Sequence, residues 1–339
     1  MTLDELKGET LGLCVSGGLD SKTIAKRLVE AGANVHCFSA DLGQPDEEDI
    51  DNVRAKMAVC GVETEIIALK EPMADACYVL IKAQGTYDGG YWNSTGLARA
   101  ITVQGLLPAM KAKGVTILGH GATGRGNDQM RFERYTNVLE PDMGVYAPWR
   151  DPALLEEFPG RTEMVDYLAK FDIEAFAGGK KKYSTDSNLA GLSHEAEDLE
   201  YLETPCTIVE PTMGVWPEQA PDEIETVTIR FEAGRATEIN GARVTPLEGI
   251  VLANEIGGRN GLWMKNALEN RIIGTKSRGV YEAPGMELLA VALQQIYQAT
   301  MDKTASGLFE HLSRLVARHR PDGPPIETNA RTTPRPFYL

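Results

Sequence analysis

The sequence has few cysteines, and none of them lie close together. Cys14, Cys37, Cys60, Cys77 and Cys206 are widely separated and form no CxxC pair. An odd number of separated cysteines indicates reduced thiols in a cytoplasmic protein, and it argues against a disulfide framework or a cysteine-based zinc site. We expect these cysteines to act as small hydrophobic side chains in the core.

Long apolar runs and a net positive charge are also missing. No stretch approaches the roughly 20 apolar residues that cross a bilayer, and Met1–Leu6 lacks the basic start of a signal peptide. The formal net charge of −15 argues against a broad nucleic-acid surface and against binding to an anionic membrane. These absences predict a soluble protein with no nucleic-acid partner and no membrane partner.

The chain is long enough for a sizeable core and, by length, for two domains. In the first half, short apolar segments alternate with helical patterns, which predicts a parallel sheet covered by helices on both faces. Ligands of such sheets bind at the carboxyl ends of the strands, where Ser16, Ala40 and Gly119 are placed. The expected strands are residues 11–15, 35–40, 62–69 and 115–118, and the clearest helix is 97–113.

An acidic run follows the second expected strand. Pro45 and the residues Asp46–Asp49 are typical of the first turn of a helix, where carboxylates complement the helix dipole. A metal site is the alternative interpretation of these carboxylates. We expect the solvated start of a helix.

The pattern changes after about residue 175. Alternating segments at 226–231 and 236–239 predict antiparallel strands around a turn at Ala233–Gly234, and helical periodicity returns at 247–256 and 288–297. This half predicts a second domain of the α+β class. The resulting division is an α/β nucleotide-binding domain at 1–172, a second domain at 173–319, and a flexible tail rich in proline and polar residues at 320–339.

A glycine-rich loop follows the first expected strand. Ser16-Gly17-Gly18-Leu19-Asp20-Ser21 joins that strand to a helix, so that several backbone N–H groups converge on one point. The glycines allow close backbone approach, and the helix dipole adds positive potential for an anion. The loop predicts binding of ATP phosphates, although it is neither a GxxxxGK[ST] nor a GxGxxG motif. Asp20 is open to two roles, as a magnesium ligand or as the cap of the helix.

Further blocks occur in register with this loop. With them the sequence resembles the N-type ATP pyrophosphatases and, more narrowly, the argininosuccinate synthase family. The resemblance implies a parallel-sheet domain of the adenine nucleotide alpha-hydrolase-like fold, followed by an α+β synthetase domain. The blocks are Ala40–Gln44, His120–Phe132, Tyr183–Asn188, His194–Tyr201, Glu269–Arg271 and Lys276–Glu282.

The resemblance implies an AMP-forming carbon–nitrogen ligase of arginine biosynthesis that joins citrulline to aspartate, with ATP and Mg2+. In this family the ureido oxygen of citrulline attacks the α-phosphate of ATP, which gives a citrullyl-adenylate and pyrophosphate. The aspartate amine then displaces AMP. Because a urea oxygen leaves only once it is adenylated, the protein contributes positioning and electrostatic stabilisation.

Matching each position to the family implies the site residues. The implied catalytic residues are Asp20, Asp128 and Arg131, with Asp20 as the candidate magnesium ligand. ATP would be held by Cys14, Val15, Ser16, Gly17, Gly18, Leu19, Asp20, Ser21, Lys22, Ala40, Gly121, Thr123 and Asp186. Aspartate would be held by Thr95, Thr123, Asn127 and Asp128, and citrulline by Tyr91, Asp128, Arg131, Ser184, Ser193, Glu195, Glu269 and Tyr281.

The chain departs from the family pattern in three places. Lys22 replaces a hydroxyl in the phosphate loop, and both phosphate contact and solvent exposure are open for it. Gly96 lacks the hydroxyl expected to meet the citrulline carboxylate. The family usually continues into a long helix that clasps neighbouring subunits of a tetramer, so we expect a homo-oligomer in which this clasp is absent or replaced. The Lys180–Lys182 run is either a solvated surface or an attractor of anionic substrate.

Two alternatives accompany this hypothesis. A family relative that acts on another ureido or amide acceptor in specialised biosynthesis is motivated by Lys22, Gly96 and the C-terminal region. A non-catalytic ATP-binding relative is the other, and the presence of Asp128, Arg131 and Glu269 argues against it. RNA-thiolating relatives are disfavoured, because they need catalytic cysteine chemistry and a basic surface.

Overall fold

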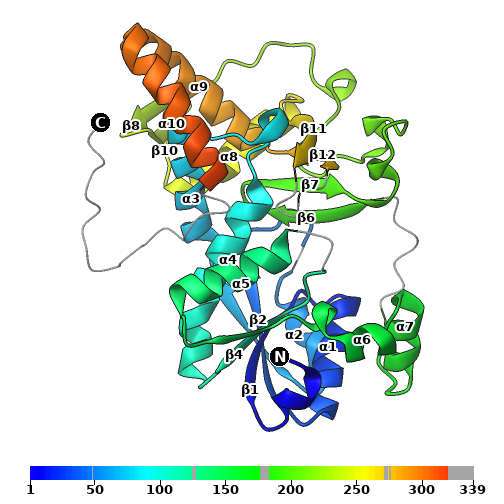
Figure 1. Cartoon of the computed structure of the whole chain (residues 1–339). Helices are drawn as coiled ribbons and strands as arrows, with labels where there is room; N and C mark the ends of the chain where they lie inside the picture. The colour runs from blue at the N-terminus through cyan, green and yellow to red at the C-terminus, as the bar shows by residue number, and fades with distance from the viewer. Residues whose placement is uncertain (48, 124–126, 176–182, 271–273, 275, 320–339) are drawn as a thin grey trace.

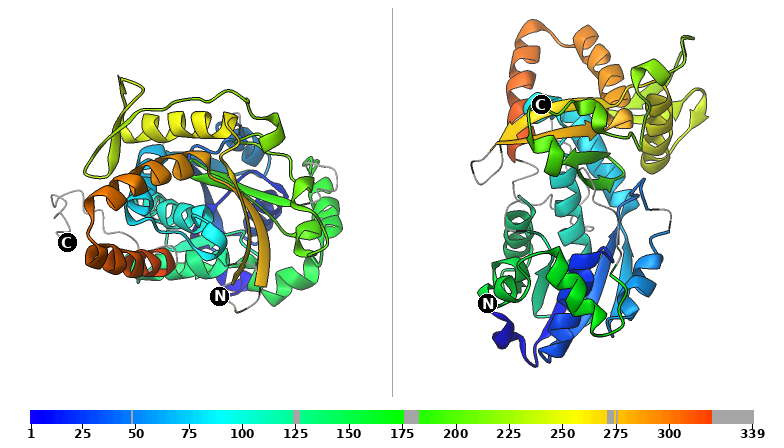
Figure 2. Two further views of the ribbon diagram at one scale, coloured as in Figure 1. Left: turned by 90° about the horizontal axis from the view of Figure 1, so that it is seen from above. Right: turned by 90° about the vertical axis from the view of Figure 1, so that its right-hand side faces the viewer.

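The computed structural model divides the chain into two lobes that the long helix α4 connects (Figures 1 and 2). The lower lobe is a parallel sheet with helices on both faces, and the upper lobe combines antiparallel strands with helices. None of the described helices is long and apolar enough to span a membrane. The described residues are 1–47, 49–123, 127–175, 183–270, 274 and 276–319.

The lower lobe has a five-stranded sheet in the order β3-β2-β1-β4-β5, and every pair is parallel. Cys14 at the end of β1 pairs with Phe38 of β2 and with His120 of β4, so these strands end close together. The order reverses between β1 and β4, which is where open α/β sheets bind ligands. The strands are β1 (Thr10–Cys14), β2 (Asn34–Asp41), β3 (Glu63–Ala68), β4 (Ile117–His120) and β5 (Gly144–Tyr146).

Helices cover both faces of this sheet, as a parallel sheet requires. One hydrophobic cluster joins β1 and β2 to α1, α2, α6 and α7, and another joins the sheet to α4 and α5. The helices are α1 (Leu19–Glu30), α2 (Asn52–Ala58), α4 (Ser94–Ala112), α5 (Asp128–Leu139), α6 (Pro152–Glu157) and α7 (Arg161–Ala169).

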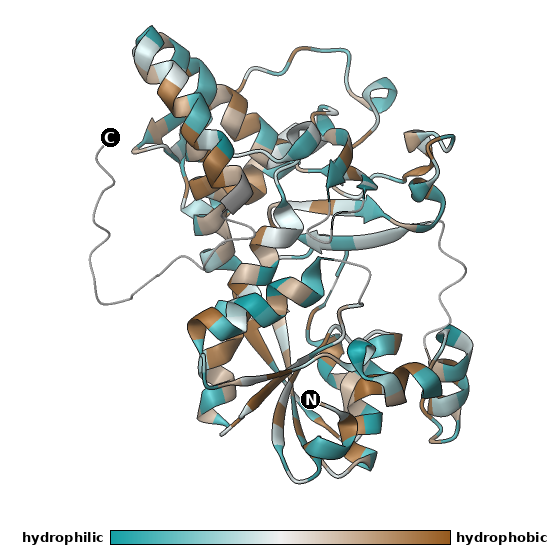
Figure 3. Ribbon diagram, in the orientation of Figure 1, coloured by the Kyte–Doolittle hydropathy of each residue, from teal (hydrophilic) through white to brown (hydrophobic). Residues whose placement is uncertain are grey.

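The upper lobe is built around a four-stranded antiparallel sheet in the order β11-β12-β7-β6. A smaller sheet, β10-β9-β8, lies beside α8 and α9. In Figure 3, α9 and α10 alternate hydrophobic and hydrophilic stretches, as expected for helices with one buried face. The elements are β6 (Ser184–Asn188), β7 (Gly191–Glu195), β8 (Ile229–Glu232), β9 (Arg235–Ile239), β10 (Ala242–Arg243), α8 (Pro246–Arg259), β11 (Met264–Asn270), β12 (Lys276–Glu282), α9 (Pro284–Thr300) and α10 (Lys303–His319).

The helix α3 (Lys70–Ala83) follows β3 in the chain but packs in the upper lobe. Its buried residues share a core cluster with α8, α9 and the amino-terminal half of α4. The upper lobe therefore includes a segment from well before residue 173. Short 3-10 helices lie at Leu3–Leu6, Asp88–Gly90, Pro148–Arg150, Glu197–Glu200, Cys206–Ile208 and Pro217–Gln219.

The expectation that the acidic run after Pro45 begins a helix is wrong. Residues 45 and 46 form a turn, and α2 begins only at Asn52. The Asp46 carboxylate accepts a hydrogen bond from the Ser187 hydroxyl, and Glu47 lies 3.6 Å from the Lys56 ammonium. These tertiary partners hold the carboxylates outside helical geometry. The C-terminal tail and the Lys180–Lys182 run lie outside the described residues.

Candidate active site

The phosphate loop lies between β1 and α1, at the carboxyl end of the sheet. Gly17 has a φ of +76°, and an added Cβ would lie 3.0 Å from Cδ of Lys56. A glycine is therefore required here on both conformational and steric grounds. The Ser16 N–H donates to the Ser21 hydroxyl oxygen at 3.1 Å, which closes the loop across the start of α1. The expected loop conformation, a tight turn into a helix N-terminus, is confirmed.

A first cavity of about 530 Å3 opens directly beyond this loop. Its wall brings together the carboxyl ends of β1, β2 and β4, the start of α5 and the strand β6. We call it the nucleotide cavity. The predicted ATP-binding residues on its wall are Cys14, Val15, Ser16, Asp20, Ser21, Ala40, Gly121, Thr123 and Asp186.

A second cavity, of about 760 Å3, lies between α4, α5 and the four-stranded sheet. We call it the substrate cavity. The register of the sheet explains why the predicted citrulline residues meet there: Ser184 is opposite Glu195, and Ser193 is opposite Tyr281. Residues directly opposite in antiparallel strands project from the same face. The predicted aspartate and citrulline residues on its wall are Tyr91, Thr95, Thr123, Asn127, Asp128, Arg131, Ser184, Ser193, Glu195, Glu269 and Tyr281.

The two cavities share the residues Ala122, Thr123 and Asp128. Asp128 is the first residue of α5, and its carboxylate makes two ion pairs at this common wall. Its Oδ2 accepts from Nε of Arg99 at 2.8 Å, and its Oδ1 accepts from Nη1 of Arg131 at 2.9 Å. The side chains of Arg99, Asp128 and Arg131 therefore form a charged boundary between the nucleotide cavity and the substrate cavity.

Arg99 is a site residue that sequence reasoning missed. It lies on α4, lines the nucleotide cavity, and also donates from Nη2 to Oδ2 of Asp186 at 2.8 Å. Arg99 thus joins α5 to β6 of the other lobe. Its position one helical turn after Thr95 is the signal that could have found it, because residues four apart share a helix face.

The paired charges strongly affect one another. Burial acts to raise the pKa of Asp128, but the Arg99 and Arg131 guanidiniums outweigh burial and lower this pKa below its ordinary value. Burial acts to lower the pKa of Arg99, and Asp128 and Asp186 outweigh it and raise that pKa. Both shifts favour the charged forms, so Arg99 is a cation and Asp128 an anion at neutral pH.

A stacked tyrosine pair forms another wall of the substrate cavity. The rings of Tyr91 and Tyr281 are parallel within 16°, with centroids 3.6 Å apart. The Tyr281 hydroxyl donates to Oε1 of Glu269 at 2.6 Å, and the Tyr91 hydroxyl accepts from the Thr95 N–H at 3.1 Å. Burial raises the pKa of both phenols. They therefore act as neutral hydrogen-bonding groups rather than as bases.

Asp20 lines the nucleotide cavity, and burial raises its pKa. Among the described residues, no three His, Cys, Asp or Glu side chains form a metal cluster. Mg2+ usually takes one or two protein carboxylates and completes its shell with phosphate and water oxygens. A single Asp20 carboxylate in this cavity therefore fits a magnesium ion that arrives with ATP. The capping role is not observed, because Gly18 is the N-cap of α1.

Lys22 lies away from the wall of the nucleotide cavity. Its side chain is buried, with 6% exposure, and its ammonium donates to the Glu174 carbonyl oxygen at 2.9 Å. The interpretation of Lys22 as a solvent-exposed residue is wrong. The predicted ATP-binding residues Gly17, Gly18 and Leu19 are likewise not among the residues that line this cavity, whereas Ser16, Asp20 and Ser21 of the same loop are.

His120 is a further residue of the nucleotide cavity that sequence reasoning did not single out as a ligand. It is buried at the end of β4, and its ring stacks on Phe132 with centroids 4.8 Å apart. Burial lowers its pKa to about 4, so the imidazole is neutral at pH 7. Its Nδ1 accepts from the Ala122 N–H at 3.3 Å, which assigns the proton of the neutral ring to Nε2.

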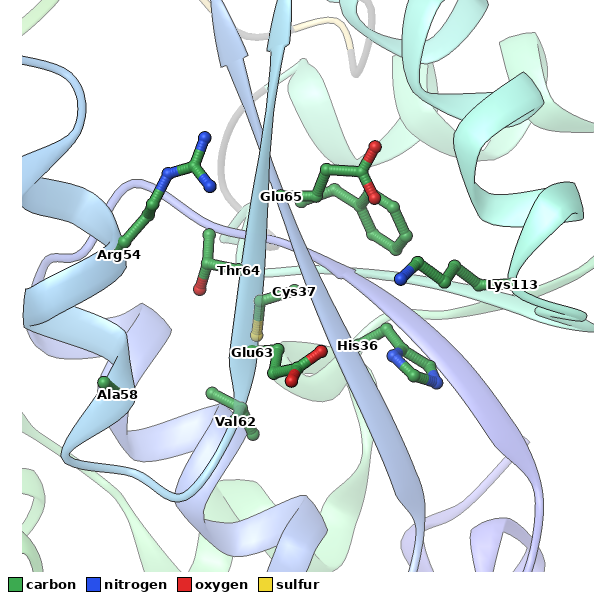
Figure 4. A pocket seen from close by; sticks show the side chains of 10 residues that line it. His36, Cys37, Arg54, Ala58, Val62, Glu63, Thr64, Glu65 and Lys113 are labelled. Carbon is green, nitrogen blue, oxygen red and sulfur yellow. The ribbon is translucent and has the colours of Figure 1, made fainter.

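A separate hollow at the edge strand β3 contains none of the predicted site residues. His36, Thr64 and Glu65 project from β2 and β3 there, between Arg54 and Lys113 (Figure 4). It shares Phe38 with the nucleotide cavity but is lined by no residue of the phosphate loop.

A glycine-rich loop at the reversal point of a parallel sheet, opening into a cavity beside a helix N-terminus, defines a nucleotide-binding α/β protein of the HUP class. Residues 10–174 match the family model "Arginosuccinate synthase N-terminal HUP domain". Residues 183–319 match the model "Arginosuccinate synthase C-terminal domain". Together these matches cover most of the chain, which therefore belongs to the argininosuccinate synthase family, a family of ligases whose HUP domain binds ATP.

Proposed function

We propose that the protein joins a citrulline-like ureido amino acid to aspartate, with cleavage of ATP to AMP and pyrophosphate. The observation that carries the proposal is the common wall of the two cavities at Thr123 and Asp128. An adenylation needs the ureido oxygen beside the α-phosphate, and two adjoining cavities with a shared wall allow that approach. Family membership supports the same class of reaction.

In the first step, the ureido oxygen attacks the α-phosphorus, and the bond to the bridging oxygen of pyrophosphate breaks. The phosphate loop holds the departing pyrophosphate through backbone N–H groups. Arg99 lines the nucleotide cavity and pairs with Asp128 and Asp186. Its positive charge stabilises the negative charge that develops at the phosphoryl centre. Asp20, on the wall of this cavity, would hold Mg2+, which would neutralise part of the phosphate charge.

In the second step, the aspartate amine attacks the activated ureido carbon. The C–O bond to AMP breaks, AMP departs, and the amine proton is lost to solvent. Thr95, Thr123 and Asn127 line the substrate cavity beside Asp128, and they orient aspartate for this attack. The contribution of these groups is positioning, because a well-oriented intramolecular reaction gains many orders of magnitude in rate.

A second candidate has the same chemistry with a different ureido acceptor. The observation that favours it is Gly96, which brings no side chain to the start of α4. Such an acceptor would belong to a specialised cytoplasmic pathway rather than to arginine biosynthesis.

Pyrophosphate release with ATP, Mg2+, aspartate and a series of ureido compounds tests both candidates. We expect turnover only when both amino acids are present, with citrulline as the preferred acceptor. Preference for another ureido compound would select the second candidate. ATP binding without pyrophosphate release from any pair would instead identify a non-catalytic relative. Asp128→Asn, which removes the charge between Arg99 and Arg131, is the inactive control.

A further inference from the structure

Asn93 is a buried polar residue on the wall of the substrate cavity, beside Arg131. It has 4% exposure and a left-handed backbone conformation, with φ of 48° and ψ of 44°. It immediately precedes α4, where an asparagine commonly caps the helix with its side chain. The Asn93 side chain makes no such cap hydrogen bond. Its amide is therefore available for another purpose.

Arg131 determines how the Asn93 amide is oriented. Nη2 of Arg131 donates to Oδ1 of Asn93 at 3.3 Å. Because a guanidinium has only donors, the oxygen of the amide must face Arg131 and the NH2 group must face away from it. Among the described residues, the side-chain hydrogen bond of Asn93 uses Oδ1 and leaves Nδ2 without an acceptor, in a residue that lines the substrate cavity. An amide donor on a cavity wall can donate to a ligand, and a hydrogen bond to a charged acceptor is stronger than one to a neutral acceptor.

We propose that Asn93 and Arg131 together bind a carboxylate of an amino-acid substrate, with Asn93 donating one hydrogen bond from Nδ2. Two adjacent donors, one of them cationic, match the two oxygens of a carboxylate. Asp128 holds the other side of the guanidinium at 2.9 Å, so Arg131 is fixed between two acceptors. Gly96, in the first turn of α4, provides no competing side-chain donor.

This inference rests on the proposed function, because it assigns Asn93 and Arg131 to the carboxylate of one of the two amino acids in that reaction. The carboxylate could belong to the ureido amino acid or to aspartate. Equilibrium binding separates the two sources and does not require turnover. If the protein binds the amino acids but releases no pyrophosphate, the proposed reaction fails while the Asn93 inference is still tested.

The experiment measures dissociation constants of the full chain by calorimetry, for each amino acid in the presence of a non-hydrolysable ATP analogue. Asn93→Gly removes the amide and tolerates the left-handed conformation, and Asn93→Asp keeps the shape but replaces the donor with a negative charge. Asn240→Gly is the matched control: Asn240 is also left-handed, with φ of 51°, and its Oδ1 accepts from the Thr228 N–H, outside both cavities.

We expect Asn93→Gly to weaken binding of one amino acid by about ten- to a hundredfold, since a hydrogen bond to a charged group is lost. Asn93→Asp weakens it further, and ATP affinity is unchanged in both variants. An analogue of that amino acid without the carboxylate binds wild type and Asn93→Gly equally. If only the affinity for the ureido amino acid falls, the bound carboxylate belongs to that substrate. If only the affinity for aspartate falls, the carboxylate belongs to aspartate. Unchanged affinities, or an equal loss for the analogue, overturn the proposal.

Discussion

Nε of Arg99 lies 2.8 Å from Oδ2 of Asp128, at the wall that the nucleotide and substrate cavities share. The same guanidinium reaches Asp186 on a strand of the upper lobe, also at 2.8 Å. One side chain therefore joins helices α4 and α5 to the sheet that carries most of the predicted citrulline residues.

Arg99→Lys tests this bridge. A lysine keeps the charge but has a single point of contact, so it cannot hold both carboxylates in the planar geometry of a guanidinium. We expect kcat/KM for pyrophosphate release to fall by about a hundredfold, as when one preorganised donor at a reacting centre is removed. Arg150→Lys is the control, because Arg150 makes an exposed pair with Glu133. Equal activity of the two variants would contradict the assignment.

Tyr281→Phe tests the hydrogen bond to Glu269. The variant keeps the ring that stacks on Tyr91 and removes only the hydroxyl that donates at 2.6 Å. We expect KM for the ureido substrate to rise about tenfold, because one hydrogen bond to a charged group is lost, while KM for ATP is unchanged. Steady-state kinetics with each substrate varied in turn gives the comparison. Tyr167→Phe is the control: the Tyr167 hydroxyl is buried and has no partner among the residues that the structure describes, so we expect every KM to stay unchanged.

His120 predicts a pH dependence of stability. Burial lowers the folded-state pKa from 6.5 to about 4, so the unfolded chain binds the proton more readily. The free energy of unfolding therefore rises with pH between about 4 and 6.5, by about 3 kcal/mol from this residue, and is constant above that window. Urea unfolding of wild type and His120→Gln at several pH values measures it. A pH slope identical in both proteins would exclude His120 as its cause.

Gly17→Ala tests the phosphate loop. The alanine meets both an unfavourable φ of +76° and the Lys56 side chain at 3.0 Å. We expect the dissociation constant of ATP to rise at least tenfold, because the loop must shift to relieve the contact. Gly114→Ala is the matched control: its φ is +70°, and no atom of the described part of the chain lies within 4 Å of the added Cβ. Both variants lose about 1 kcal/mol of stability from backbone strain, but only Gly17→Ala loses ATP affinity.

Lys22→Met separates a structural role from phosphate binding. The ammonium donates to the Glu174 carbonyl and lies away from the cavity wall, so its removal affects packing between α1 and the end of the lower lobe. We expect a loss of about 1 kcal/mol in the free energy of unfolding and a KM for ATP within about twofold of wild type. A large rise in KM for ATP would instead show that Lys22 reaches the phosphates.

Much of the lower lobe follows from local sequence. The apolar segments that end at Cys14, Asp41 and His120 are largely buried strands, and the segment that ends at Ala68 is a partly exposed edge strand. The loop after Cys14 needs its glycine at 17 for backbone reasons alone. The helix at 94–112 and the hairpin at 229–239 also have a local periodicity. These features were predictable because each is determined by residues within a few positions of one another.

Other features depended on contacts between distant segments. The acidic run after Pro45 has a helix-start composition, yet Ser187 and Lys56 bind its carboxylates in a different geometry. The strands β6 and β7 carry Ser184, Ser193 and Glu195, but polar residues conceal their strand pattern. The turn at residues 189 and 190 sets the register of β6 against β7, whereas the pairing of β7 with β12 joins segments that are distant in the chain.

The sequence by itself determined the phosphate loop, the parallel sheet and the family resemblance. These could be predicted because sequence motifs and hydrophobic periodicity are local properties of the chain. Only the tertiary structure decided that Arg99 bridges Asp128 and Asp186, that the Lys22 ammonium donates to the Glu174 carbonyl, and that Asn93 lines the substrate cavity. Each of these features depends on a contact between side chains that are far apart in the sequence. Folding brings the partners together, because a buried charge or hydrogen-bond donor needs a partner.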